Sequence, residues 1–106
     1  MLAAQELTIE LIHLLRPIVG TLGARDSSMR DQLRRAATSV MLNLGEGIRR
    51  TGADKKRTYR IAAAEAQEVK AALATAIAWG YLDAAEIAPA QALADRVARI
   101  TYGLAR

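Results

Sequence analysis

Apolar residues recur at steps of three and four along most of the chain, which is the spacing of one face of an α-helix. The first stripe predicts a helix over about residues 3–16, with a kink or an end near Pro17, because proline removes an internal hydrogen-bond donor. Apolar and polar residues do not alternate over a strand-length segment, so no strand is predicted. The stripe consists of Leu7, Leu11, Leu14, Leu15, Ile18 and Leu22.

Turn residues separate this helix from a second one. Gly20, Gly23 and residues 26–28 indicate the turn, and Ser28 resembles the cap of a helix start. The second helix is expected to end near Arg50. Its apolar stripe consists of Leu33, Ala36, Ala37, Val40, Leu44 and Ile48.

Two glycines, Gly45 and Gly47, lie inside the second helix, where each costs about 1 kcal/mol relative to alanine. They indicate either a neighbouring helix that approaches closely, which is the interpretation we favour, or early fraying of the helix.

A short turn leads to a third helix over about residues 54–79, which ends at Gly80. Asp83 and Glu86 resemble a capping pair for a fourth helix, whose first turns are interrupted by Pro89. The stripes are Tyr59, Ala62, Ala66, Val69, Leu73 and Ile77 in the third helix, and Leu93, Val97, Ile100 and Leu104 in the fourth.

Four helices joined by short loops predict an all-α fold, an antiparallel up-and-down four-helix bundle that forms a single domain over residues 1–106. The composition, 52% apolar and 25% charged, is typical of a globular protein. No apolar segment approaches the roughly 20 residues of a membrane helix, and the start, MLAAQELTIE, is acidic. We therefore expect a cytoplasmic protein without membrane association.

The inventory of reactive side chains is small. The chain has no cysteine and one histidine, so disulfides, thiolate zinc sites, cysteine nucleophiles and imidazole metal clusters are not expected. His13 falls on the polar side of its helix, where an exposed residue is a simpler interpretation than a catalytic base. We expect no catalytic residue, no metal and no cofactor.

Large core residues are scarce, because the chain has no phenylalanine, one tryptophan and many alanines. Each facing pair therefore buries little area, and association could supply more burial. Ile9, Ile12 and Val19 lie roughly opposite the main stripe of the first helix, which favours an oligomer interface over scattered surface apolar residues.

Positive charge is concentrated in the middle of the chain. Residues 25–60 hold ten Arg or Lys against four Asp or Glu, whereas the remainder holds five against seven. The densest group predicts a nucleic-acid-binding surface, with a merely solvated loop as the alternative. It comprises Arg49, Arg50, Lys55, Lys56, Arg57 and Arg60.

Polar residues also share one face of the second helix. Together with Glu65 and Glu68 of the third helix they predict a structural network of Arg and carboxylate groups between the helices. A catalytic acid and base pair is the functional alternative. The predicted network comprises Arg35, Ser39, Asn43, Glu46 and Glu68, and Arg50 falls on the same face.

The segment QLRRAATSVMLNLGEGIRR, residues 32–50, resembles the second helix of the 23S ribosomal RNA intervening-sequence protein family. Matching positions are Arg35, Ala36, Ser39, Val40, Asn43, Leu44, Glu46, Gly47 and Arg50, and Gly45 replaces the usual alanine. The resemblance implies an up-and-down four-helix bundle, often a ring-shaped pentamer, with no established catalytic activity and a suspected link to ribosomal RNA.

From these observations we expect a non-enzymatic homo-oligomer that binds RNA or DNA backbone through its basic central segment. A protein-interaction scaffold is the alternative, and a small hydrolase is a third class.

Overall fold

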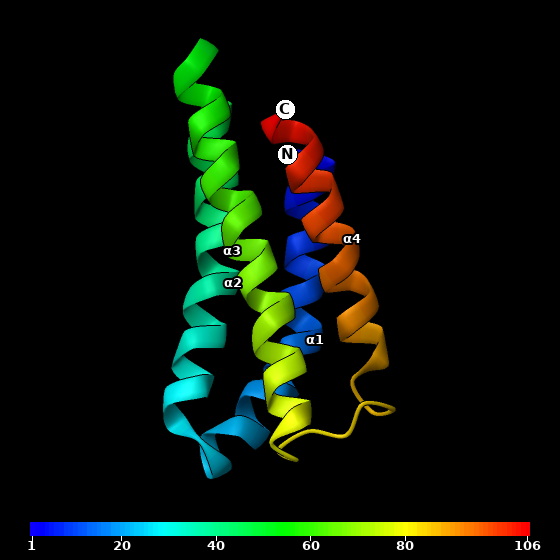
Figure 1. The fold of residues 1–106 in the computed structure, drawn as a ribbon. Coiled ribbons are helices and arrows are strands. Elements are labelled where there is room, and N and C mark those ends of the chain that lie inside the picture. Colours follow the sequence, from blue (N-terminus) through cyan, green and yellow to red (C-terminus); the bar gives the residue numbers. More distant parts are fainter.

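The computed structural model describes residues 1–106 and contains four α-helices and no strand (Figure 1). The predicted all-α four-helix bundle is thereby confirmed. The helices are α1 (Ala3–Arg25), α2 (Ser27–Ile48), α3 (Gly52–Ala78) and α4 (Ala88–Ala105).

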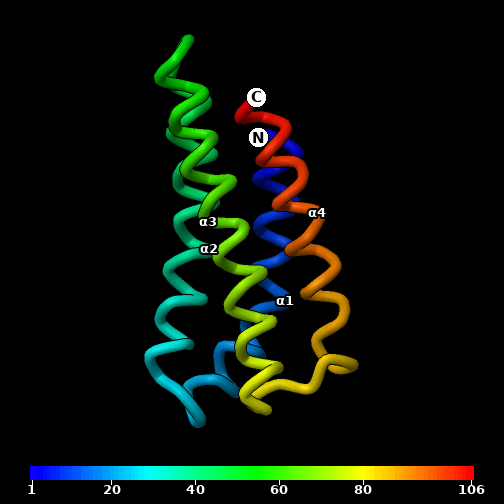
Figure 2. The backbone as a smooth tube through the Cα atoms, in the orientation of Figure 1, coloured from blue at the N-terminus to red at the C-terminus, as the bar shows by residue number.

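The helices reverse direction at each connection, and each one packs against its neighbours in the sequence while α1 also packs against α4. The resulting bundle measures 43 × 22 × 20 Å. The hairpin of α2 and α3 extends beyond the other two helices, at the same end of the bundle as both termini (Figure 2). The residues of the α2–α3 connection are therefore exposed.

Small side chains dominate the core. Nine of its 22 buried apolar residues are alanine, and Tyr59 is its sole aromatic residue. Alanine allows helices to pack closely, but each buried alanine removes little apolar area from water. This arrangement agrees with the expectation that the core buries little apolar area per residue.

The first helix is longer than predicted. It continues through Pro17 for eight further residues to Arg25. Proline leaves the carbonyl group of His13 without its helical partner, but both residues are exposed, so water can hydrogen-bond to that carbonyl. Of the two effects predicted for Pro17, a kink or an end of the helix, the end does not occur.

The apolar faces of α1 also differ from the prediction. Leu14, assigned to the buried stripe, is 39% exposed. Ile12 and Val19, assigned to the opposite face, are half-buried and pack against the core, whereas Ile9 is exposed. The buried sector of α1 is centred on Leu11 and Leu15 and is rotated slightly relative to the expected stripe.

The turn between the first two helices is a single residue, Asp26. Its carboxylate accepts a hydrogen bond of 3.0 Å from the backbone N–H of Met29 and caps α2. Gly20 and Gly23, predicted to lie in the turn, belong to α1, and Ser28 is not the cap. Asp26 suits the cap position because its backbone is extended there.

The other two connections agree more closely with expectation. Residues 49–51 join α2 to α3, and Gly80, with a φ of 79°, follows the end of α3 as predicted. Asp83 accepts a hydrogen bond from the N–H of Ala85, so it stabilises the connection and does not cap α4. Pro89 lies in the first turn of α4 and does not interrupt it, because an N–H is not needed there.

The two glycines of α2 have different surroundings. A Cβ atom at Gly47 would lie 2.3 Å from Cε1 of Tyr59, so the aromatic ring of α3 occupies the space of the missing side chain. A Cβ atom at Gly45 would meet only Gln5, at an ordinary 3.7 Å. Close approach of the Tyr59 ring therefore accounts for Gly47. Fraying of the helix does not, because α2 is continuous through both glycines.

By length and composition alone, α1 could cross a membrane, contrary to the sequence-based expectation. In the structure, however, its buried residues pack into the bundle core. This arrangement is common for the core helix of a helical bundle.

Candidate nucleic-acid interface

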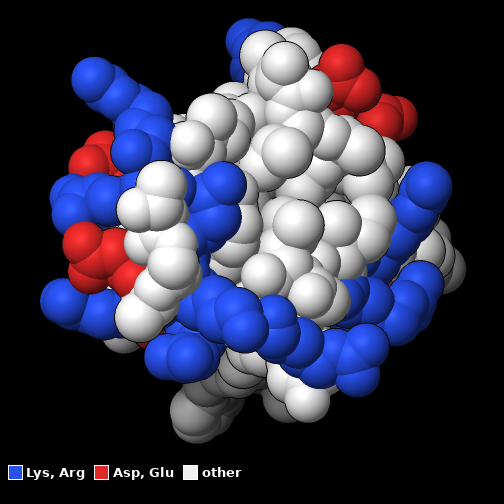
Figure 3. All heavy atoms as spheres, turned by 90° about the horizontal axis from the view of Figure 1, so that it is seen from above, with Lys and Arg blue, Asp and Glu red and all other residues white.

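The six cations predicted to bind nucleic acid converge at one end of the bundle, and we call this group the basic turn: Arg49, Arg50, Lys55, Lys56, Arg57 and Arg60. Two follow the end of α2 and four lie in the first turns of α3, so the short connection brings them together. Seen from that end, Lys and Arg side chains lie along both sides and the lower edge of the molecule, with acidic side chains among them on the left (Figure 3).

Acidic neighbours pair with one member of the basic turn, Arg50. Its guanidinium donates a 2.9 Å hydrogen bond to Glu46 and lies 3.6 Å from Asp54. The hydrogen bond from Arg50 to Glu46, followed by the charges of both carboxylates, raises the pKa of Arg50 above its ordinary value. Arg50 is thus the member least available to an added phosphate.

The other five members of the basic turn form no ion pair within the chain. Four of them are exposed, and Lys55 is half-buried because it lies one helical turn before the buried Tyr59. The Thr51 side chain does not cap α3. The N-terminus of α3, which is the positive end of its helix dipole, lies among these cations. The end of the bundle therefore presents unpaired positive charge to solvent.

Part of the predicted polar network lies within α2. The Asn43 side chain donates hydrogen bonds to the backbone carbonyl and to the hydroxyl of Ser39, at 2.9 and 3.0 Å. Glu46 pairs with Arg50 on the same helix and does not reach α3. We expected Glu46 or Glu68 to contact an arginine across helices, and Glu68 makes that contact, whereas Glu46 points outward from α2 and pairs with the next turn.

Arg35 makes the cross-helix contacts of the predicted network. Its guanidinium lies 3.9 Å from Glu65 and 3.7 Å from Glu68, both on α3. Because the Arg35 side chain is 60% exposed, these ion pairs are solvated and each contributes less than about 1 kcal/mol. The network joins the helices as predicted, but it is not buried.

Glu65 is the least exposed member of this cluster. Its side chain is only 18% exposed, and its Oε2 atom is buried without a hydrogen-bond partner. Burial, and then the neighbouring charge of Glu68, raise the pKa of Glu65 above 4.5, although Arg35 opposes the shift. This residue was noted in the sequence only as a possible partner for arginine, because the spacing of apolar residues does not show how far a carboxylate beside the stripe is covered by the next helix.

Another charged cluster, between α3 and α4, was not predicted. Lys70 of α3 donates a 2.8 Å hydrogen bond to Asp95 of α4, and Arg99 contacts the same carboxylate. The hydrogen bond from Lys70 is the main cause that lowers the pKa of Asp95 below 3.8. Spacing within α4 could have suggested the Asp95 and Arg99 pair, but Lys70 lies 25 residues away in sequence.

The residues predicted to form an oligomer interface border a hollow between α1 and α2. This hollow has a volume of about 370 Å³, and Ile12 and Val19 line it together with Leu15 and Leu33. Arg16 and Arg34 also line it, and Ile9 lies exposed one turn before Ile12. Self-association through this face is still a prediction.

The fold and surface define the chain as an all-α four-helix bundle with a strongly basic end. A family model described as 23S rRNA-intervening sequence protein matches residues 3–103. The chain therefore belongs to the 23S rRNA-intervening sequence protein family, as the resemblance of the second helix predicted.

A crystal structure has the same fold. It is that of a protein with unknown function from the S23 ribosomal protein family of Bacteroides thetaiotaomicron. The TM-score is 0.86 with 16% sequence identity, and the similarity covers 98% of this chain and 99% of the other. No curated protein matches the chain.

Proposed function

We propose that this protein is a non-enzymatic, cytoplasmic bundle that self-associates and binds the phosphate backbone of RNA or DNA through the basic turn. One observation carries the proposal: five of the six cations in the basic turn have no acidic partner within the chain. Unpaired Lys and Arg side chains can neutralise phosphates and release the counterions condensed on nucleic acid. Such contacts position a protein on nucleic acid without reading its sequence.

The family assignment supports this choice of ligand. The family description refers to 23S rRNA, which makes RNA the first nucleic acid to test. In an oligomer, the basic turn would recur in every subunit, and multivalency would strengthen contacts that are individually weak.

The test compares two charge-reversal variants by fluorescence anisotropy with a labelled duplex RNA of mixed sequence. Lys56→Glu with Arg57→Glu should abolish most binding and reduce the slope of log affinity against log salt by about 2. Arg25→Glu with Arg96→Glu is the matched control, because these arginines are exposed, unpaired and outside the basic turn. Both variants have the same net charge.

Equal loss of affinity in the two variants would mean that net charge, and not the basic turn, governs binding. Absence of binding by the unmodified protein at low salt would refute the proposed function.

A protein-interaction scaffold is the second candidate function, and the hollow between α1 and α2 favours it. Its apolar floor and its arginines suit an amphipathic partner with acidic residues. If the unmodified protein binds no nucleic acid, this face becomes the first surface to probe.

A further inference from the structure

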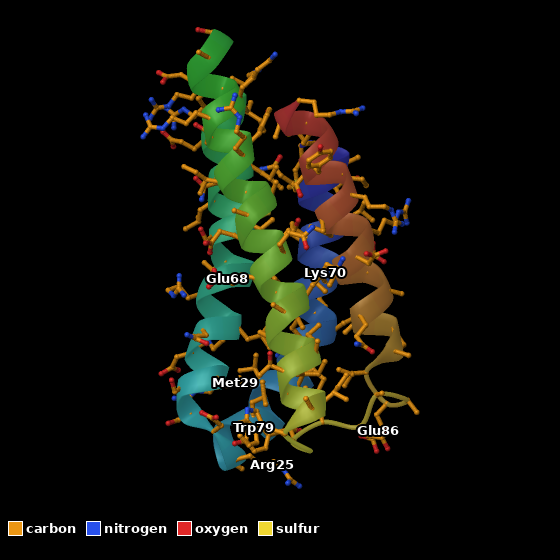
Figure 4. The ribbon with its side chains drawn as sticks, viewed as in Figure 1. Arg25, Met29, Glu68, Lys70, Trp79 and Glu86 are labelled. Carbon is orange, nitrogen blue, oxygen red and sulfur yellow. The ribbon has the colours of Figure 1, made fainter.

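A groove of about 410 Å³ runs along the seam between α3 and α4, outside the basic turn. Gln67 and Lys70 line it from α3, and Arg99, Tyr102 and Arg106 line it from α4. Figure 4 shows Lys70 on the side of α3 that faces α4, whereas Glu68 points toward α2. The groove thus combines three cations, an amide and an aromatic ring.

Tyr102 provides an open aromatic surface in this groove. Its side chain is 62% exposed, which is unusual for an aromatic residue in a chain whose other tyrosines are at least half-buried. The guanidinium of Arg106 lies over the ring, 5.9 Å from its centroid. An exposed ring beside a cation is the arrangement with which proteins stack a nucleic-acid base and contact its phosphate.

The charge of the groove is positive despite one carboxylate. Asp95 pairs with both Lys70 and Arg99, so the free positive charge of the groove is that of Arg106. The two ion pairs hold Lys70 and Arg99 beside one another across the seam. Arg106 has no acidic partner.

Helical spacing connects the groove to the basic turn. Lys56, Arg60, Ala63, Gln67 and Lys70 recur at steps of three and four, so they form one stripe along α3. At a rise of 1.5 Å per residue, this stripe extends for about 21 Å. Both the basic turn and Arg106 lie at the end of the bundle that carries the termini. The stripe therefore leads from the cations of the basic turn to the seam through the neutral residues Ala63 and Gln67.

We propose that the α3–α4 seam is a binding path for single-stranded nucleic acid, in which one base stacks on Tyr102 and adjacent phosphates contact Arg106 and the α3 stripe. This inference rests on the proposed function, because the strand enters from the basic turn. A duplex is excluded from stacking here, since its bases already stack on one another. The seam thus adds a preference for single strands to an otherwise unselective cationic surface.

The experiment measures binding of a labelled mixed-sequence RNA strand, the corresponding DNA strand and the matched duplexes by fluorescence anisotropy. Tyr102→Leu should weaken binding of the single strands by about 5- to 100-fold and leave duplex binding unchanged. Tyr102→Phe should retain single-strand binding, because it keeps the ring. Comparison of the RNA and DNA strands identifies the preferred sugar.

A second variant blocks the groove without removing charge or the ring. A Cβ atom at Gly103 would have no neighbour within 4 Å, so Gly103→Leu fills the groove with little cost to the fold. It should weaken single-strand binding as Tyr102→Leu does. Circular dichroism melts should show that both variants fold.

The outcomes separate this inference from the proposed function. If the unmodified protein binds duplex and single strands, and Tyr102→Leu and Gly103→Leu bind single strands equally well, the seam is not the path and the basic turn alone suffices. If the unmodified protein binds no nucleic acid at low salt, both the proposed function and the path are wrong.

Discussion

At the residue scale, Gly47 determines how closely α2 approaches α3. The ring of Tyr59 is buried and occupies the position that a side chain at residue 47 would need. Gly47→Ala would force a buried aromatic side chain or a helix to move, so it should destabilise the fold by about 1 to 3 kcal/mol. Thermal unfolding followed by circular dichroism measures the loss.

Gly45 supplies a matched control for this prediction, because it lies two residues away in the same helix. Gly45→Ala should raise stability by up to about 1 kcal/mol, since alanine favours the helix and finds only an ordinary contact there. Replacing Tyr59 with leucine should reduce the cost of Gly47→Ala. Similar melting of the two alanine variants would show that the ring does not constrain this contact.

Glu65 links stability to pH. Burial raises its folded-state pKa above 4.5, so the folded protein favours the protonated carboxyl group. The stability that this preference contributes is fully present below the unfolded-state pKa and is lost as pH rises through the folded-state pKa. Glu65→Gln should therefore melt at a higher temperature than the unmodified protein at pH 7, and at a similar temperature near pH 4.

Glu86→Gln is the control for this pH effect, because Glu86 is exposed and forms no ion pair. Its melting temperature should follow that of the unmodified protein at both values of pH. An equal or lower melting temperature for Glu65→Gln at neutral pH would show that Arg35 outweighs the burial of the carboxylate.

Among the helices, α2 begins directly after α1 because Asp26 caps its first turn. No other residue separates the two helices, and the Asp26 carboxylate satisfies an N–H that α2 would otherwise leave unpaired. Asp26→Ala should cost about 1 kcal/mol, whereas Asp26→Ser should retain most of the stability. Ser28→Ala should change the melting temperature little. A large loss of stability in this variant would show that Ser28, and not Asp26, caps α2.

Ion pairs contribute less to how the helices associate. Arg35 reaches two carboxylates on α3, and Lys70 reaches one on α4, but all of these groups except Glu65 are substantially exposed. Exposed pairs are typically worth less than about 1 kcal/mol each, so close packing of alanines carries most of the association between helices. The expected cost of removing Glu46 is correspondingly small, since its only partner is Arg50 on the same helix.

At the scale of the whole molecule, the two ends of the bundle differ in chemistry. One end carries the basic turn, and the other carries Trp79, which is 69% exposed and lies at the same end of the bundle as Arg25 and Met29 (Figure 4). Because Trp79 is the sole tryptophan, its fluorescence reports on the end remote from the basic turn. A ligand at the basic turn should leave that emission unchanged.

Self-association is also a property of the whole molecule. We expect an oligomer, with a pentamer suggested by the family resemblance, whose interface includes Ile9 of α1. Ile9→Glu should lower the mass measured by light scattering, because a charge would be placed in an apolar contact. Ile61→Glu is the matched control, since Ile61 is exposed to a similar degree on α3. A monodisperse monomer of the unmodified protein would contradict the prediction.

The features that could be predicted from the sequence are those that depend on local interactions. Helical periodicity depends on neighbours three and four residues apart, so it predicted four helices, the stop at Gly80 and the stretch of cations around the α2–α3 connection. The motif in α2 indicated the family for the same reason, since it lies within one helix. None of these features requires knowledge of which helices pack together.

The tertiary structure decided whatever depends on a partner remote in the sequence or on solvent. Pro17 is tolerated because the carbonyl it frees faces water, Gly47 is required because Tyr59 fills its space, and Glu65 is perturbed because α2 covers it. The seam that joins Lys70 to Tyr102 likewise exists only once α3 and α4 pack side by side. The spacing of apolar residues along one helix predicts which face is buried, but not which residues of another helix that face meets.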